Sequence, residues 1–184
     1  MTDNVNTTSP VDDDDLFEAA TDTFPSKFDL RDRLVVIYPN GTKGQRQGEN
    51  GKPYDWYETT TVVLDDGPKG WQEEVIGEGG EFQPNLVASV EDNGPQVLRN
   101  FQWSAGGLTS RLATKLPDAT GKPGSVVGRI NSRPNSKKGM APSWSIGKPT
   151  EEDMVTAREQ RALCAAVRAE SMKEAVKAAD ENAF

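Results

Sequence analysis

Five short runs rich in β-branched and aromatic residues recur through the middle of the chain, and glycine or proline follows each within a few residues. Runs of this length and composition are typical of strands, and such turn residues end them. Leu34 to Tyr38, for example, is continuously apolar and is followed by Pro39, Asn40 and Gly41. The sequence therefore predicts a mainly β fold, with strands within residues 34–38, 54–64, 97–103, 124–131 and 143–146.

Two helices are predicted, one within this series of strands and one after it. Leu108, Leu112 and Leu116 recur at every fourth residue, which is the spacing of one apolar stripe on a helix. Thr150, followed three residues later by Asp153, resembles the capping box that begins a helix. The alanine-rich chain after it is expected to remain helical to about residue 179.

The order of these elements is strand, a long basic loop (41–53), two strands, helix, strand, a second basic loop (132–142) and strand. This is the order of a five-stranded OB-like barrel with one helix between strands 3 and 4, although another small β-barrel would also fit the strand pattern. We expect the barrel domain to span residues 27–149, with 67–95 as an irregular insertion rich in glycine and glutamate. Residues 150–184 would then form a C-terminal helix and an acidic tail that ends in Phe184.

The first 26 residues contain seven acidic residues and no basic one, and their apolar residues show no periodicity. Such a segment cannot bury enough apolar surface to offset the entropy that ordering costs. We therefore predict that residues 1–26 form a disordered acidic tail.

The residue types that the chain lacks exclude several kinds of site. It has no histidine and one cysteine, Cys164, so a Ser-His-Asp triad, a Cys-His pair and a zinc site built on these residues are excluded. We expect a non-catalytic protein with no cofactor and no metal, in a reducing compartment. No run approaches 18 apolar residues, and the first ten residues lack the basic and apolar regions of a secretory signal, so we expect a cytoplasmic protein that does not cross a membrane.

Charge is distributed unevenly along this acidic chain, whose formal net charge is -8. Residues 96–149 contain nine basic residues and one acidic residue, whereas residues 27–95 contain seven basic and thirteen acidic residues. A compact basic segment is the electrostatic footprint of a protein that binds a polyanion. The alternative is that these bases pair with the acids of 27–95 across one folded surface.

Aromatic residues stand close to both predicted basic loops, as single-strand binding requires. A basic groove follows the phosphates of a strand, while flat aromatic side chains stack on its bases. Strand alternation places Tyr54 and Trp56 on one face and Tyr57 on the other, and one of these faces must be the core, to which we assign Phe101. The candidate nucleic-acid-binding residues are Lys43, Arg46, Lys52, Tyr54, Trp56, Trp103, Arg129, Arg133, Lys137, Lys138 and Trp144.

Several segments carry a resemblance to a known family. They are DLRDRLVVIYP, VVLDDG, LTSRLATKL and the block VVGRINSRPNSKKGMAPSWSIGKPTEEDMVTAREQ, all within about residues 28–160. The chain resembles a family of small actinobacteriophage proteins that are commonly described as single-stranded-DNA-binding proteins of OB type. The resemblance implies an OB fold and a role in phage DNA replication or recombination in the cytoplasm of the host bacterium.

The C-terminal residues suggest a second contact site. Asp180, Glu181 and Phe184 make the end of the chain similar to the acidic, phenylalanine-terminated tip with which bacterial single-stranded-DNA-binding proteins dock replication and repair partners. The helix from Thr150 could also drive homo-oligomerisation. A competing hypothesis is therefore a structural or interaction protein, in which an OB-like barrel and a helix mediate protein assembly without nucleic acid.

Overall fold

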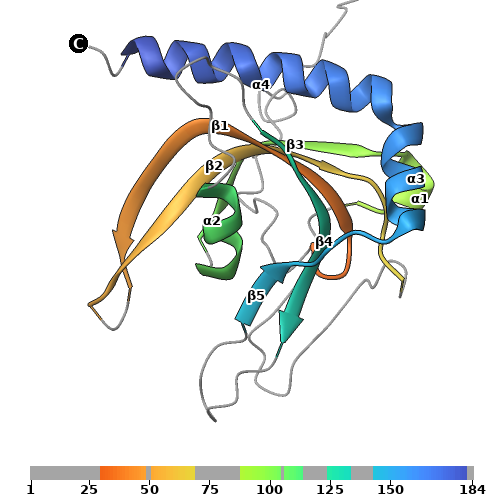
Figure 1. Ribbon diagram of the computed structural model, residues 1–184, viewed down its shortest axis with the longest axis horizontal. Coiled ribbons are helices and arrows are strands. Elements are labelled where there is room, and N and C mark those ends of the chain that lie inside the picture. Colours follow the sequence, from red (N-terminus) through yellow and green to blue (C-terminus); the bar gives the residue numbers. More distant parts are fainter. Residues whose placement is uncertain are drawn as a thin grey trace, which may run out of the picture.

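A single antiparallel sheet of five strands, in the order β3-β2-β1-β4-β5, forms the centre of the computed structural model (Figure 1). The structure describes residues 30–48, 51–68, 88–104, 106–113, 124–133 and 143–181. The strands are β1 (Leu34–Gln47), β2 (Pro53–Val63), β3 (Gln96–Trp103), β4 (Val126–Arg133) and β5 (Ser143–Ile146). The helices are α1 (Val90–Asn93), α2 (Gly106–Ala113), α3 (Glu151–Glu159) and α4 (Arg161–Glu181).

The predicted mainly β fold, with a helix between the third and fourth strands, is confirmed. β1 is the central strand and pairs with both β2 and β4. The sheet curls around α2, which contacts both β2 and β5 (Figure 1). Within the described residues the edge strands β3 and β5 do not pair with each other, so the sheet is open where a closed barrel was expected.

The inner face of the sheet, toward α2, holds the larger core. Leu108 and Leu112 of α2 are fully buried, as their fourfold spacing predicted. Trp103 is also fully buried, and its Nε1 donates a hydrogen bond to Thr59 Oγ1 (3.0 Å). Its ring meets Phe101 edge to face with 4.7 Å between centroids, so the assignment of Phe101 to the core is confirmed.

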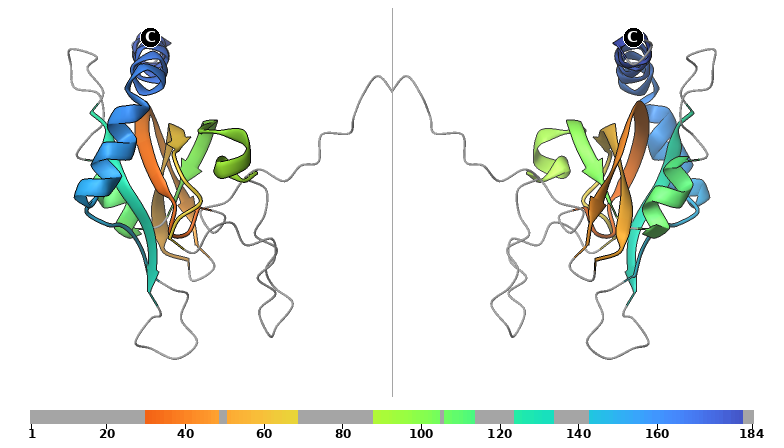
Figure 2. Two further views of the ribbon diagram at one scale, coloured as in Figure 1. Left: turned by 90° about the vertical axis from the view of Figure 1, so that its right-hand side faces the viewer. Right: turned by 90° about the vertical axis from the view of Figure 1, so that its left-hand side faces the viewer.

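The outer face of the sheet is covered by α4, which crosses above β1 in Figure 1 and is seen end-on in Figure 2. Strand alternation gives this face its own apolar residues, because every second side chain of β1 and β2 points away from α2. Val167 of α4 is buried among them, with Leu163 and Cys164 beside it. The sheet residues of this second core are Leu34, Val36, Tyr38, Val62 and Leu64.

The C-terminal helix predicted from Thr150 is confirmed in its first turn and divided further along. Thr150 Oγ1 accepts a hydrogen bond from the Asp153 backbone N–H, and the Asp153 carboxylate accepts one from Thr150 N, which completes the capping box. The helix ends at Glu159, and α4 begins after Gln160 in a new direction (Figure 1). One straight helix could not both keep Asp153 at the end of the sheet and lie along β1.

The glycine-rich stretch after the first strand was predicted to be a long loop, and this prediction is wrong. β1 continues through it to Gln47 and pairs with the start of β2, from Lys43 opposite Tyr57 to Gln47 opposite Pro53. Isolated glycines weaken a strand, but the aromatic start of β2 supplies partners for both backbone and side chains. The acidic tail 1–26 and most of the insertion 67–95 lie outside the described residues.

Candidate nucleic-acid interface

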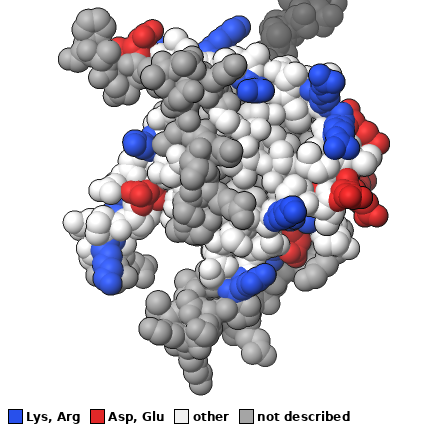
Figure 3. All heavy atoms as spheres, viewed as in Figure 1, with Lys and Arg blue, Asp and Glu red and all other residues white. Residues whose placement is uncertain are grey.

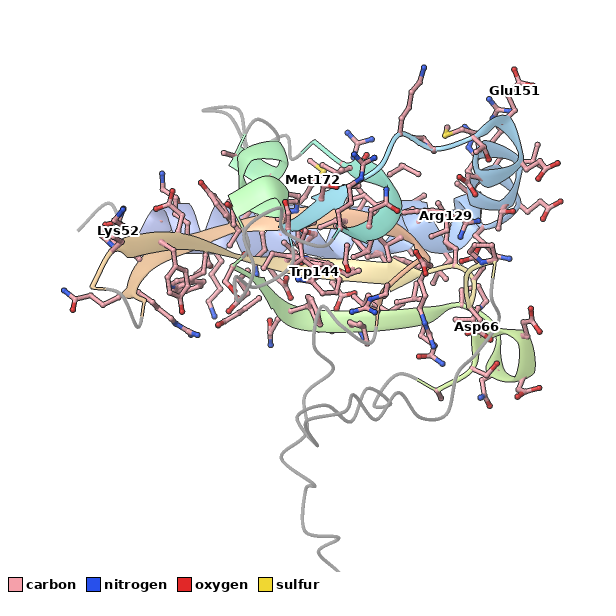
Figure 4. All side chains as sticks on the ribbon, turned by 90° about the horizontal axis from the view of Figure 1, so that it is seen from below. Lys52, Asp66, Arg129, Trp144, Glu151 and Met172 are labelled. Atoms are coloured by element: carbon pink, nitrogen blue, oxygen red, sulfur yellow. The ribbon has the colours of Figure 1, made fainter. Side chains whose placement is uncertain are left out.

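The extension of β1 and β2 forms a two-stranded hairpin at the lower left of Figure 1, away from α3. Three of the predicted phosphate-binding residues are exposed on it, Lys43, Arg46 and Lys52. Figure 4 shows Lys52 at the tip of the hairpin, and Figure 3 shows basic side chains on this part of the surface, whereas acidic side chains gather over α3 at the opposite side. The described part of the hairpin thus has three exposed basic side chains, with the acidic Asp55 exposed beside them.

Register aligns an aromatic residue with a glycine on the outer face of the hairpin. Gly44 lies directly opposite Trp56, and directly opposed residues share a face. A Cβ atom at position 44 would lie only 2.7 Å from the Trp56 ring atoms Cε2, Cζ2 and Nε1. The half-buried indole thus lies against the backbone of Gly44, which no other residue type could replace without moving the ring.

Arg46 connects this indole to the neighbouring strand. Its guanidinium carbon is 5.4 Å from the centre of the Trp56 ring, within the range of a cation–π interaction. Its Nη2 donates a hydrogen bond of 2.7 Å to Gln102 Oε1 in β3. Tyr54, opposite Arg46, is 37% exposed. We call Gly44, Arg46, Tyr54, Trp56 and Gln102 the hairpin platform.

The two other predicted stacking tryptophans are not available, and these predictions are wrong. Trp103 is fully buried and Trp144 is 4% exposed, both in the core around α2. Figure 4 places Trp144 near the middle of the molecule, far along the sheet from the hairpin tip. The guanidinium of Arg31 lies 5.4 Å from the centre of the Trp144 ring. Because the Trp144 ring is buried in this core, it offers no face to a base.

Arg129, predicted to bind phosphate, instead holds three segments of the fold together. Its Nη2 contacts Asp65 Oδ2 at 2.8 Å and Asp153 Oδ1 at 2.5 Å, and its Nη1 donates to Asp65 Oδ1 and to the Asp32 carbonyl. Burial alone would lower the pKa of Arg129, but the two carboxylates outweigh burial and raise it. Two aspartates thus already pair with this charge, and phosphate contact by Arg129 stays a prediction.

Asp153 shows how completely this network is satisfied. Its side chain is 3% exposed, and burial by itself would raise its pKa. Hydrogen bonds from Thr150 and Arg129, together with the positive charge of Arg129, hold the pKa of Asp153 below its usual value. The network fixes the start of α3 to β4 and to the end of β2.

The remaining candidates fall at the ends of the described segments. Arg133 is exposed and ends β4, opposite Ser143. Lys137 and Lys138 lie outside the described residues, as does Phe184. Asp180 is exposed in the last turn of α4, and Glu181 is the last residue of that helix. The structure thus places Lys43, Arg46, Lys52, Tyr54 and Trp56 on one hairpin, and it does not place the second basic loop. Lys43 pairs with the buried Tyr57 and so lies on the face opposite to that of Trp56 and Arg46.

Two residues of the hairpin platform were not among the predicted site residues. Gln102 alternates with the buried Phe101 and Trp103, and this alternation was the available signal that it faces outward. Gly44 could be identified only through its pairing with Trp56, which depends on the register of two strands.

Within the described residues there is no group of three or more Cys, Asp or Glu side chains that could hold a metal ion. None of the described helices is long and apolar enough to cross a membrane. Comparison of the chain with protein-family models, with curated proteins and with solved structures finds no match.

Proposed function

We propose that this protein is a non-catalytic single-stranded-DNA-binding protein whose binding surface is the hairpin platform and the basic residues around it. The observation that carries the proposal is the juxtaposition of Trp56 with Arg46 on an exposed, basic hairpin. A base stacked on an aromatic side chain contributes about 1–3 kcal/mol, and a neighbouring cation can pair with the phosphate beside it.

The topology supports an OB-like fold as part of this proposal. β1 pairs with both β2 and β4, and a helix connects β3 to β4, as in an OB barrel opened between β3 and β5. α2 contacts strands on both sides of that opening. OB folds bind oligonucleotides on the face of strands 2 and 3 and on the loops between strands 1 and 2 and strands 4 and 5. The hairpin platform lies on the ends of β1 and β2 that adjoin the first of these loops, and it reaches β3 through Gln102.

The cellular role comes from the family resemblance. Protection or organisation of single strands during phage DNA replication or recombination, in the cytoplasm of the host bacterium, would use a surface without base-specific contacts. The C-terminal tip with Asp180, Glu181 and Phe184 would then recruit a replication or recombination partner.

Fluorescence anisotropy of labelled oligo-dT and of a matched duplex tests the proposal. Three phosphates neutralised by Lys43, Arg46 and Lys52 predict a slope of about 2 in log affinity against log salt, or about a 20-fold loss between 50 and 200 mM salt. Trp56→Ala should weaken binding about 5- to 150-fold, the equivalent of one lost stack.

Lys148→Ala is the matched control for Arg46→Ala, because Lys148 is an exposed base after β5 and is distant from the hairpin in sequence. Arg46→Ala should reduce both the affinity and the salt slope, and Lys148→Ala should leave both within about twofold. Equal affinities for oligo-dT and duplex, or no binding at 50 mM salt by folded protein, would overturn the proposal. The second outcome would favour the alternative of a protein-assembly module.

A further inference from the structure

α4 contacts the outer face of the sheet in two chemically different ways. Its first half packs through apolar side chains, with Val167 buried and Leu163 beside it. Its second half, residues 170–181, turns Ser171, Glu174 and Ala175 inward instead. The helix is thus held firmly near its start, while its second half lies on the sheet through small and polar groups.

Two polar groups in this second half are buried without compensation. Ser171 is fully buried, and neither its Oγ nor Glu174 Oε2 makes a hydrogen bond to any residue that the structure describes. Buried polar atoms are normally paired, and an unpaired one opposes burial. This contrasts with Asp153 in α3, whose carboxylate is fully engaged.

Glu170, at the start of this second half of α4, forms an ion pair with Arg99 of β3. Arg99 Nε and Nη2 donate to Glu170 Oε1 and Oε2 at 3.0 and 3.1 Å, which is the two-pronged geometry with which arginine also binds phosphate. Both side chains are about half exposed. Arg99 lies three residues before Gln102 of the hairpin platform, on the face that an OB fold uses for a strand.

Burial of a charge weakens the same contact. Glu174 interacts electrostatically with its helix neighbour Glu170, with Arg99 of β3 and with Glu58 of β2. Burial first, and then the negative charges of Glu170 and Glu58, raise the pKa of Glu174, against the opposing effect of Arg99. Burial of the ionised Glu174 carboxylate therefore opposes its contact with the sheet, in the half of α4 that has the least apolar contact.

We propose that residues 170–181 of α4 form a displaceable cover over the sheet. In the free protein Glu170 pairs with Arg99, and a phosphate of bound single-stranded DNA replaces this carboxylate. The proposal rests on the function proposed above. Binding exchanges the carboxylate of Glu170 for a phosphate on Arg99 and moves the second half of the helix off the sheet, while Leu163 and Val167 keep the first half docked.

The binding test compares two variants of the full chain that lose the same charge. Glu170→Gln should bind oligo-dT about 2- to 5-fold more tightly at 50 mM salt, because Arg99 is released from an exposed ion pair. Glu159→Gln, at an exposed position at the end of α3, is the control and should stay at the wild-type affinity. Equal affinities of the two variants would overturn the competition.

Hydrogen exchange tests the displaceable cover in the absence of DNA. Glu174→Gln removes the charge whose burial opposes docking, so amide exchange at pH 7 should slow several-fold across residues 170–181 and remain unchanged across 161–168. Addition of oligo-dT to the wild-type protein should accelerate exchange in 170–181.

The two proposals fail in different ways. If no variant binds oligo-dT, the proposed function fails, and so does the proposal that single-stranded DNA competes with Glu170 for Arg99. If Glu174→Gln exchanges like the wild type, or if oligo-dT binds and slows exchange in 170–181, the cover itself is overturned.

Discussion

Arg129 joins three segments of the fold, and its removal should destabilise the protein more than the loss of any exposed charge. In Arg129→Ala, Asp153 keeps its contacts with Thr150 but loses its only ion-pair partner in the described chain, and its side chain is 3% exposed in the wild-type fold. Breaking a buried ion pair by removing one partner costs about 3–5 kcal/mol. Asp65 is 29% exposed, so its half of the network adds only about 0.5 kcal/mol. We expect a loss of about 3.5–5.5 kcal/mol in the free energy of unfolding.

Urea unfolding at pH 7, followed by far-UV circular dichroism, measures this loss. The matched control is Arg133→Ala, because Arg133 is four residues further along β4 and exposed. We expect the control to change the free energy of unfolding by less than about 0.5 kcal/mol. Replacing both partners, as in Arg129→Met with Asp153→Asn, should recover part of the loss because no buried charge is then left unpaired.

The pH dependence provides an independent check. The pKa of Asp153 is lowered in the folded state, so its contribution to stability is present above the unfolded pKa of about 4 and disappears as the pH falls through the folded value. The difference between wild type and Arg129→Ala should therefore shrink below about pH 4. An Arg129→Ala protein as stable as Arg133→Ala at pH 7 would refute the reasoning, as would a difference that is unchanged at pH 3.

Two further predictions concern the hairpin and the insertion. Gly44→Val should weaken oligo-dT binding as much as Trp56→Ala does, because the valine side chain displaces the Trp56 indole. The control is Gln45→Val, on the opposite face of the hairpin, and equal affinities of the two valine variants would contradict the stacking geometry. Replacing residues 69–87 with a short Gly-Ser linker should change the free energy of unfolding, measured in urea, by less than about 1 kcal/mol. The reason is that Asp66 accepts hydrogen bonds from the first turn of α1, which already holds the two ends of this stretch together. A larger loss would mean that residues 69–87 contribute to the core.

Local patterns were sufficient to predict the parts of the fold that depend on neighbours in sequence. The apolar run from Leu34 became the central strand, and the leucines at 108 and 112 became the buried side of α2. The capping box at Thr150 formed as predicted, because all of its hydrogen bonds lie within four residues. Alternation also separated Tyr54 and Trp56 from the buried Tyr57.

Features that depend on pairing between distant residues were not predicted. The stretch from Gly41 to Gln47 has the composition of a loop, and it is a strand because the start of β2 lies beside it. Trp103 and Trp144 stand near basic residues in the sequence, but the curl of the sheet turns both toward α2. Which face of a strand becomes the core is decided by the elements that pack on it, and the alternation of residues alone leaves that choice open.

The charge pattern shows the same limit and changes where a polyanion would bind. The basic segment 96–149 was the strongest electrostatic signal in the sequence, yet Arg99 and Arg129 within it are paired with Glu170, Asp65 and Asp153. Exposed positive charge also lies on the hairpin, which belongs to a segment of the sequence with a net negative charge. Ion pairing acts between residues that are distant in sequence, so the sum of charges along a segment does not give the field above it. A strand bound to this protein would therefore begin on the β1–β2 hairpin, and it would gain Arg99 only by displacing a carboxylate of α4.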